Sequence, residues 1–64
     1  MKSDLVDIDA HIHAETTQAV LISDDGEREH AVWLPKKQIE IERRTKTLAV
    51  VTLPHWLAFE KELI

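Results

Sequence analysis

The sequence predicts a small, mostly β domain: a bent antiparallel sheet or small open barrel of about five strands, with one short C-terminal helix. Three observations favour this fold. Polar and apolar residues alternate over residues 5–15, an Asp-Gly pair follows the next apolar run, and helical spacing begins only after Pro54. With 64 residues and no cysteine, the chain is expected to form a single domain, residues 1–64, without disulfide bonds.

The first expected strand covers residues 5–15, because a period of two is typical of a strand with one buried face. The apolar side carries Val6, Ile8, Ala10, Ile12 and Ala14, and the polar side carries Asp7, Asp9, His11, His13 and Glu15. The alternation stops at residues 15–17, where we expect a bend or bulge.

The second strand is expected at residues 19–22, which are apolar on both faces, as in a central strand. Residues 23–27 read Ser-Asp-Asp-Gly-Glu and predict a tight turn, because Gly26 readily adopts positive φ. The chain is then expected to return as a strand over residues 28–34. Pro35 ends that strand because it has no N–H to donate.

Two more strands are expected at residues 39–42 and 47–53, joined by a polar turn at residues 43–46. Pro54 suits the first turn of a helix. Trp56, Phe59 and Leu63 follow it at i, i+3 and i+7, so the sequence predicts that this face of a C-terminal helix packs on the sheet.

The large aromatic side chains Trp33, Trp56 and Phe59 all lie in apolar patterns. In so small a domain we expect them in the core, where each buries about 150–250 Å². The alternative is an exposed interface residue at either tryptophan. Leu63 and Ile64 would form a further apolar patch if they did not reach the core.

Composition excludes several classes of protein. The longest apolar run has four residues, Leu48 to Val51, whereas a membrane span needs about 20. The start, Met1-Lys2-Ser3-Asp4, does not resemble a signal peptide, so we expect a cytoplasmic protein that contacts no membrane. Gly26 is the only glycine, which excludes glycine-rich phosphate-binding loops. Without a cysteine nucleophile or room for a cleft, we expect neither an enzyme nor a cofactor.

The net charge of −4 is unevenly distributed. Residues 1–30 hold eight acidic and two basic residues, and residues 31–64 hold six basic and four acidic residues. The first part therefore has a net charge of −6 and the second +2. This asymmetry predicts an acidic first hairpin and a basic edge.

Two short motifs suggest a family. The segment Trp33-Leu34-Pro35-Lys36-Lys37-Gln38-Ile39 is followed near the C-terminus by Pro54-His55-Trp56-Leu57-Ala58. Over residues 17–64 the chain resembles small uncharacterised bacteriophage and prophage proteins with W-(I/L)-P-K-S-Q-I and P-x-W-L-A motifs. Lys37 stands where these proteins usually have Ser, and His55 where they have an acidic residue. The resemblance implies a phage protein that binds host machinery, including the possibility of an anti-CRISPR inhibitor.

A second resemblance concerns Asp9, His11 and His13, which read like the D-x-H-x-H strand of metal-dependent amidohydrolases. That family builds its metal site on a barrel of about 250 residues, so the chain is too short for it. Asp9, His11 and His13 remain candidate zinc ligands, with His30 as a possible addition. The alternative is a solvated strand face on which histidine is tolerated.

The acidic hairpin is the candidate surface for a protein partner. Its residues are Asp7, Asp9, Asp24, Asp25, Glu27 and Glu29, with Glu15 nearby. Such carboxylates could imitate phosphates and dock on a basic surface of host nucleic-acid machinery. The alternatives are a solvated face that protects an edge strand, and acid–base catalysis, which would need a pocket.

The basic edge is the candidate surface for single-stranded nucleic acid. It consists of Lys36, Lys37, Arg43, Arg44 and Lys46. Small barrels that bind nucleic acid combine such residues with exposed aromatic side chains for stacking. The alternative is a solvated turn. A third hypothesis is a homo-oligomer in which an edge strand or the C-terminal helix pairs with a second copy.

Overall fold

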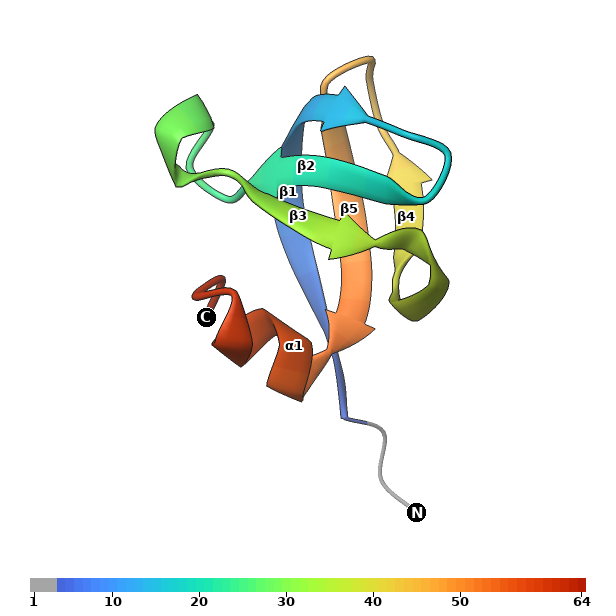
Figure 1. Ribbon diagram of the computed structural model, residues 1–64, viewed down its shortest axis with the longest axis vertical. Helices are drawn as coiled ribbons and strands as arrows, with labels where there is room; N and C mark the ends of the chain where they lie inside the picture. The colour runs from blue at the N-terminus through green and yellow to red at the C-terminus, as the bar shows by residue number, and fades with distance from the viewer. Residues whose placement is uncertain (1–3) are drawn as a thin grey trace.

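The structure is a computed structural model that describes residues 4–64. These residues form one open antiparallel sheet with the order β3-β2-β1-β5-β4 and one short helix, α1 (His55–Glu60) (Figure 1). The predicted fold class, mostly β with five strands and a short C-terminal helix, is confirmed. Residues 1–3, on which the expectation about a signal peptide partly depends, lie outside the described residues.

Strand β1 (Leu5–Glu15) lies at the centre of the sheet and changes partner along its length. Its first part pairs with β5 (Leu48–Pro54), and its last part pairs with β2 (Ala19–Ser23). The pairing shifts between Ile12 and Ala14, so the bulge occurs about three residues earlier than expected. A bulge increases local twist and bends a strand, which lets β1 serve two partners.

The two edge strands are β3 (Val32–Pro35), paired with β2, and β4 (Glu40–Arg43), paired with β5. They are consecutive in the chain but lie at opposite edges of the sheet, joined by the 3₁₀ turn η2 (Lys36–Gln38). The expected strand over residues 28–34 is only partly correct, because Arg28–His30 form a second 3₁₀ turn, η1. The β2–β3 connection is therefore longer than a tight hairpin turn.

The core lies between the curved sheet and the C-terminal segment. Its buried apolar side chains are Ile8, Ala10, Val20, Ile22, Leu34, Val51, Leu53, Leu57, Ala58 and Leu63. Burying one Val, Leu or Ile side chain stabilises a fold by about 1.5–3 kcal/mol. The alternation expected for residues 5–15 holds from Val6 to Ile12. After the bulge, Ala14 pairs with Leu21 rather than with a core residue.

The expectation that Trp33, Trp56 and Phe59 fill the core is wrong. Their exposed fractions are 45%, 54% and 68%. Trp33 alternates with the fully buried Leu34, so it points to the other face of β3. In α1, Leu57 and Ala58 take the buried face, and Trp56 and Phe59 are left on the outside.

Leu63 reaches the core through a turn rather than through the helix. Glu62 adopts a left-handed conformation with φ 60°, and the Leu63 N–H donates to the Ala58 carbonyl at 2.8 Å. The Glu62 N–H donates to the Phe59 carbonyl at 3.1 Å, which completes a Schellman motif. The turn brings Leu63 back onto the core, and Ile64 remains exposed.

None of the helices found in residues 4–64 has the length and apolar character needed to cross a membrane.

Candidate functional site

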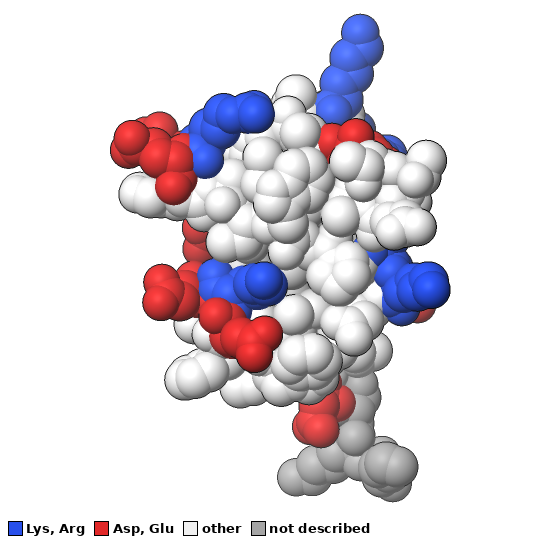
Figure 2. Space-filling view, in the orientation of Figure 1, with Lys and Arg blue, Asp and Glu red and all other residues white. Residues whose placement is uncertain are grey.

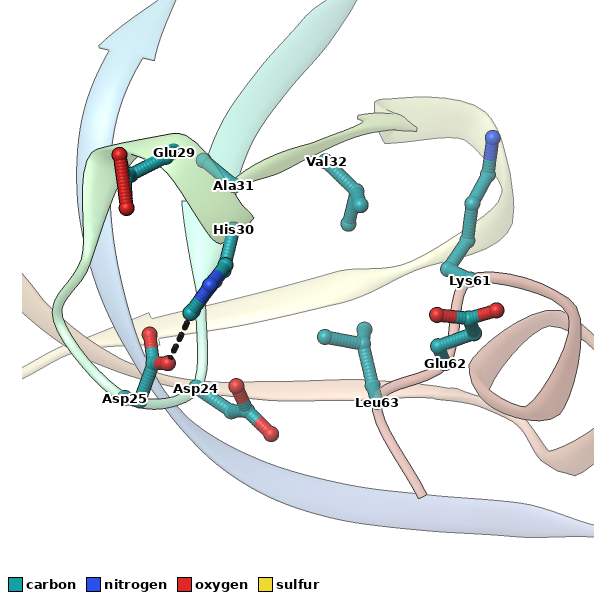
Figure 3. A pocket seen from close by; sticks show the side chains of 9 residues that line it. All are labelled: Asp24, Asp25, Glu29, His30, Ala31, Val32, Lys61, Glu62 and Leu63. Carbon is teal, nitrogen blue, oxygen red and sulfur yellow. Dashed lines mark hydrogen bonds and ion pairs between the residues drawn. The ribbon is translucent and has the colours of Figure 1, made fainter.

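A groove separates the β2–β3 connection from the chain that follows α1 (Figure 3). Its volume is about 450 Å³. One wall comes from residues 24–32 and the other from residues 61–63, which are more than 28 positions away in the sequence. The lining residues are Asp24, Asp25, Glu29, His30, Ala31, Val32, Lys61, Glu62 and Leu63.

The groove combines an apolar floor with an acidic rim. Val32 and Leu63 point toward each other across it, and Ala31 lies beside Val32 (Figure 3). Asp24 lies on one side of the groove and Glu62 on the other (Figure 3). The lining residues comprise four carboxylates and one lysine, so the rim attracts cations.

The two histidines of β1, His11 and His13, contact the acidic turn that follows β2. Ser23 is fully buried, and its Oγ accepts a hydrogen bond from the Gly26 N–H at 3.1 Å. The same Oγ shares a hydrogen bond of 2.8 Å with Nε2 of His13. Gly26 has φ 83°, and a Cβ atom at this position would lie 3.4 Å from the His11 ring. Both histidines therefore support the β2–β3 turn.

Asp25 both stabilises the turn and binds His30. One carboxylate oxygen of Asp25 accepts from the Glu27 N–H at 2.9 Å, and the other lies 2.6 Å from Nδ1 of His30. The hydrogen bond to Asp25 raises the pKa of His30, and Asp25's negative charge adds to this effect. The same bond lowers the pKa of Asp25. A protonated His30 therefore neutralises one carboxylate of the groove.

The six acidic residues predicted to bind a partner are distributed over the groove, a second depression that shares Asp24 with it, and the sheet face. Asp24, Asp25 and Glu29 line the groove. Asp9 lies with Asp24 at a smaller depression of about 180 Å³. Asp7 accepts a hydrogen bond from Thr52 Oγ1 at 2.6 Å on the sheet face, and Glu27 is exposed beside the groove without lining it.

The candidate zinc ligands Asp9, His11 and His13 are not assembled into a site. Within residues 4–64, no three His, Cys, Asp or Glu side chains lie close enough together to hold a metal ion. His13 is hydrogen-bonded to Ser23, and His30, the possible fourth ligand, is paired with Asp25. The two β1 histidines have a structural explanation in the contacts that they make with the turn.

The basic edge is largely paired with carboxylates. Lys36 and Arg43 both bind Glu15, and Nη1 of Arg44 lies 3.4 Å from a Glu42 oxygen. Lys37 and Lys46 are exposed, and no ion pair joins either to a described carboxylate. The five basic residues thus present less charge to a phosphate backbone than the sequence suggests.

An uncharged area lies at the centre of the face that β2 and β3 present to the viewer, with charged residues around its rim (Figure 2). Trp33 belongs to β3, and Trp56 and Phe59 belong to α1. The exposure of these three aromatic side chains differs from the buried position that the sequence predicts. The signal available in the sequence was the alternation of Trp33 with Val32 and Leu34.

The second wall of the groove was also missed. The sequence predicts that Leu63 packs on the sheet as part of the helix face, but nothing local in the sequence places residues 61–63 beside residues 24–32. The left-handed conformation of Glu62 turns the chain so that residues 61–63 lie beside residues 24–32. Gly or Asn is the usual residue at such a position.

Comparison with protein-family models, with curated proteins and with solved structures gives no match.

Proposed function

We propose that this protein acts by binding another protein, and that the groove receives a lysine or arginine side chain of that partner. The observation that carries this proposal is the combination of an apolar floor with an acidic rim. A lysine or arginine has an apolar stem and a cationic end. The stem would lie on Val32 and Leu63, and the cation would lie between Asp24 and Glu62.

The distribution of charge supports a basic partner. The first 30 residues have a net charge of −6, and complementary charge accelerates association and discriminates against acidic partners. Protonated His30 would reduce the attraction, because it already pairs with Asp25. The floor supplies the apolar contact that a purely electrostatic surface lacks.

Proteins that bind nucleic acid expose lysine and arginine for phosphate contacts, so they are the target class that this chemistry fits. Together with the resemblance to phage proteins, this supports a non-enzymatic phage protein in the host cytoplasm. It would inhibit a nucleic-acid-binding defence complex by occluding its basic surface, in the manner of an anti-CRISPR inhibitor.

The test compares two double variants of equal charge change. Asp24→Lys with Glu62→Lys reverses charge on both sides of the groove, and Glu27→Lys with Glu60→Lys does so outside it. Each protein is immobilised and incubated with a nuclease-treated bacterial lysate, and bound proteins are eluted with increasing NaCl. We expect the groove variant to lose specific bands that the wild type and the control retain. Equal loss from both variants would refute the groove as the site.

A second candidate function is single-stranded nucleic-acid binding, which the exposure of Trp33, Trp56 and Phe59 favours. Exposed aromatic rings stack with bases, at about 1–3 kcal/mol per base. A gel-shift assay with single-stranded DNA at low salt tests it. A shift that is lost in Trp33→Ala and in Lys37→Ala with Lys46→Ala would support this function, and no shift would dispose of it.

Self-association is the third hypothesis, because the same aromatic residues leave apolar surface on β3 and α1. Light scattering at several protein concentrations tests it. A mass that rises with concentration and falls in Trp56→Ala with Phe59→Ala would support a homo-oligomer.

A further inference from the structure

One wall of the groove continues into the free edge of the sheet. Strand β3 pairs with β2 on one side only, and it is the last strand of the described sheet on that side. Ala31 and Val32, at the start of this edge, line the groove. The edge and the groove are therefore neighbouring parts of one surface.

The register shows which backbone groups the edge offers. The Lys36 N–H donates to the Gln18 carbonyl at 2.8 Å, and this bond continues the β2–β3 register. Backbone groups alternate sides along an antiparallel strand, so those of Leu34 and Val32 also face β2. The N–H and carbonyl of Trp33 then point to the open edge.

The edge is short. Pro35 has no N–H, and the Ala31 N–H donates to the Arg28 carbonyl at 3.0 Å. This leaves the N–H of Trp33, flanked by the carbonyls of residues 31, 33 and 35. A partner strand of about three residues can use this pattern, whereas a long strand cannot.

The charge of the groove determines which kind of segment can bind at the neighbouring edge of β3. An edge strand can accept any extended chain. Here the neighbouring groove carries Asp24, Asp25 and Glu62, which attract a basic side chain and repel an acidic one. Side chains of a bound strand alternate, so a residue next to the Trp33 contact can place its cation in the groove.

We infer that the free edge of β3 takes an added strand: a short extended segment of the partner protein, hydrogen-bonded to Trp33 and carrying a lysine or arginine that enters the acidic groove. This inference rests on the proposed function and adds the conformation in which the partner is bound. The contact would be a small β-augmentation with one charged anchor.

The test uses the peptide acetyl-Thr-Lys-Val-Lys-Thr-amide and ¹H–¹⁵N NMR spectra of the full chain. We expect the Trp33 amide signal to shift on titration and its hydrogen exchange to slow by at least threefold at saturation. Two further peptides carry a backbone N-methyl group, one on the valine amide and one on the amides of both lysines. Only alternate amides of an added strand face β3, so one methylated peptide should lose binding and the other should keep it.

The outcomes separate the inference from the proposed function. If Asp24→Lys with Glu62→Lys abolishes binding but both methylated peptides bind unchanged, the groove binds lysine and strand addition is wrong. A further peptide carries glutamate in place of both lysines. If it binds as tightly as the lysine peptide, or if neither binds, the proposed function fails as well. Trp33→Pro, which removes the edge N–H, should lose binding that Trp33→Val retains. The peptide series decides the question if the proline variant does not fold.

Discussion

The carboxylate of Glu15 binds two cations from different elements, Nζ of Lys36 at 2.5 Å and Nη2 of Arg43 at 2.7 Å. Lys36 begins η2, directly after β3, and Arg43 ends β4. The β3–β4 connection is therefore attached by side chains to the end of β1. This contact joins the two edges of a sheet that backbone hydrogen bonds leave open.

Replacing Glu15 with Gln should lower stability in a pH-dependent way. The bonds from Lys36 and Arg43 lower the pKa of Glu15 below its ordinary value of 4.5. The stabilisation is thus fully present above pH 4.5 and is lost as the pH falls through the lower pKa of the folded protein. Urea midpoints measured between pH 6 and pH 3 should differ between wild type and variant at pH 6, and the difference should shrink as the pH falls below 4.5. Glu42→Gln, which removes a single pair to Arg44, is the control. An equal effect of both variants would contradict the role of Glu15.

His30 should titrate above its ordinary pKa of 6.5, because Asp25 stabilises its protonated form. The pair therefore stabilises the fold fully below pH 6.5, and this contribution disappears as the pH rises through the raised pKa. NMR titration of the His30 ring protons measures this directly. Asp25→Asn should return the pKa of His30 toward 6.5, and an unchanged pKa would show that the pair does not form in solution.

Glu62→Gly should stabilise the protein by about 1 kcal/mol, because a non-glycine residue in a left-handed conformation costs about 1–2 kcal/mol. Glu62 has φ 60°. Glu60→Gly, in the last turn of α1, is the matched control and should destabilise by up to about 1 kcal/mol. Urea unfolding measures both, and destabilisation by Glu62→Gly would contradict the left-handed turn.

Gly26→Ala should destabilise the protein by about 1–2 kcal/mol through its positive φ. The added Cβ would contact the His11 ring at 3.4 Å, an ordinary van der Waals distance. Backbone conformation is therefore the main cause, and adding His11→Ala should not restore stability. Full rescue in the double variant, measured by thermal or urea unfolding, would instead show that a clash with the ring dominates.

Leu63→Ala should cost about 2–5 kcal/mol, as expected for a buried leucine. The exposed fraction of Leu63 is 8%, whereas that of the adjacent Ile64 is 54%. Ile64→Ala should therefore change the free energy of unfolding by less than about 0.5 kcal/mol. Similar effects at both positions would mean that the turn at Glu62 does not return the chain to the core.

Most of the fold was predictable because alternation and turn residues are local signals. The alternation of residues 5–15 predicted β1, the Asp-Gly pair predicted a turn after β2, and Pro54 predicted the start of α1. The partner change of β1 was not predictable, since pairing with β5 depends on contacts distant in the sequence. The bulge at residues 12–14 likewise depends on the register with β2.

The candidate site was predicted in part. Asp24, Asp25 and Glu29 were identified from charge alone, but their opposite wall comes from the chain after α1. The aromatic residues are exposed where the sequence favoured burial, because large apolar side chains occur both in cores and on surfaces. Trp33 follows the strand alternation, and in α1 the buried positions are Leu57 and Ala58, which leaves Trp56 and Phe59 exposed.

The central position of β1 has a consequence for how the protein folds. About half of this strand has no partner until residues 48–54 are available, because Leu5 to Ala10 pair only with β5 in the described sheet. Pairing the first part of β1 with β5 closes a long loop. This closure costs conformational entropy before the new contacts stabilise the fold, which slows folding. During synthesis, the hairpin of β1 and β2 can form early. The remainder of β1 must wait until residues 48–54 have left the ribosome.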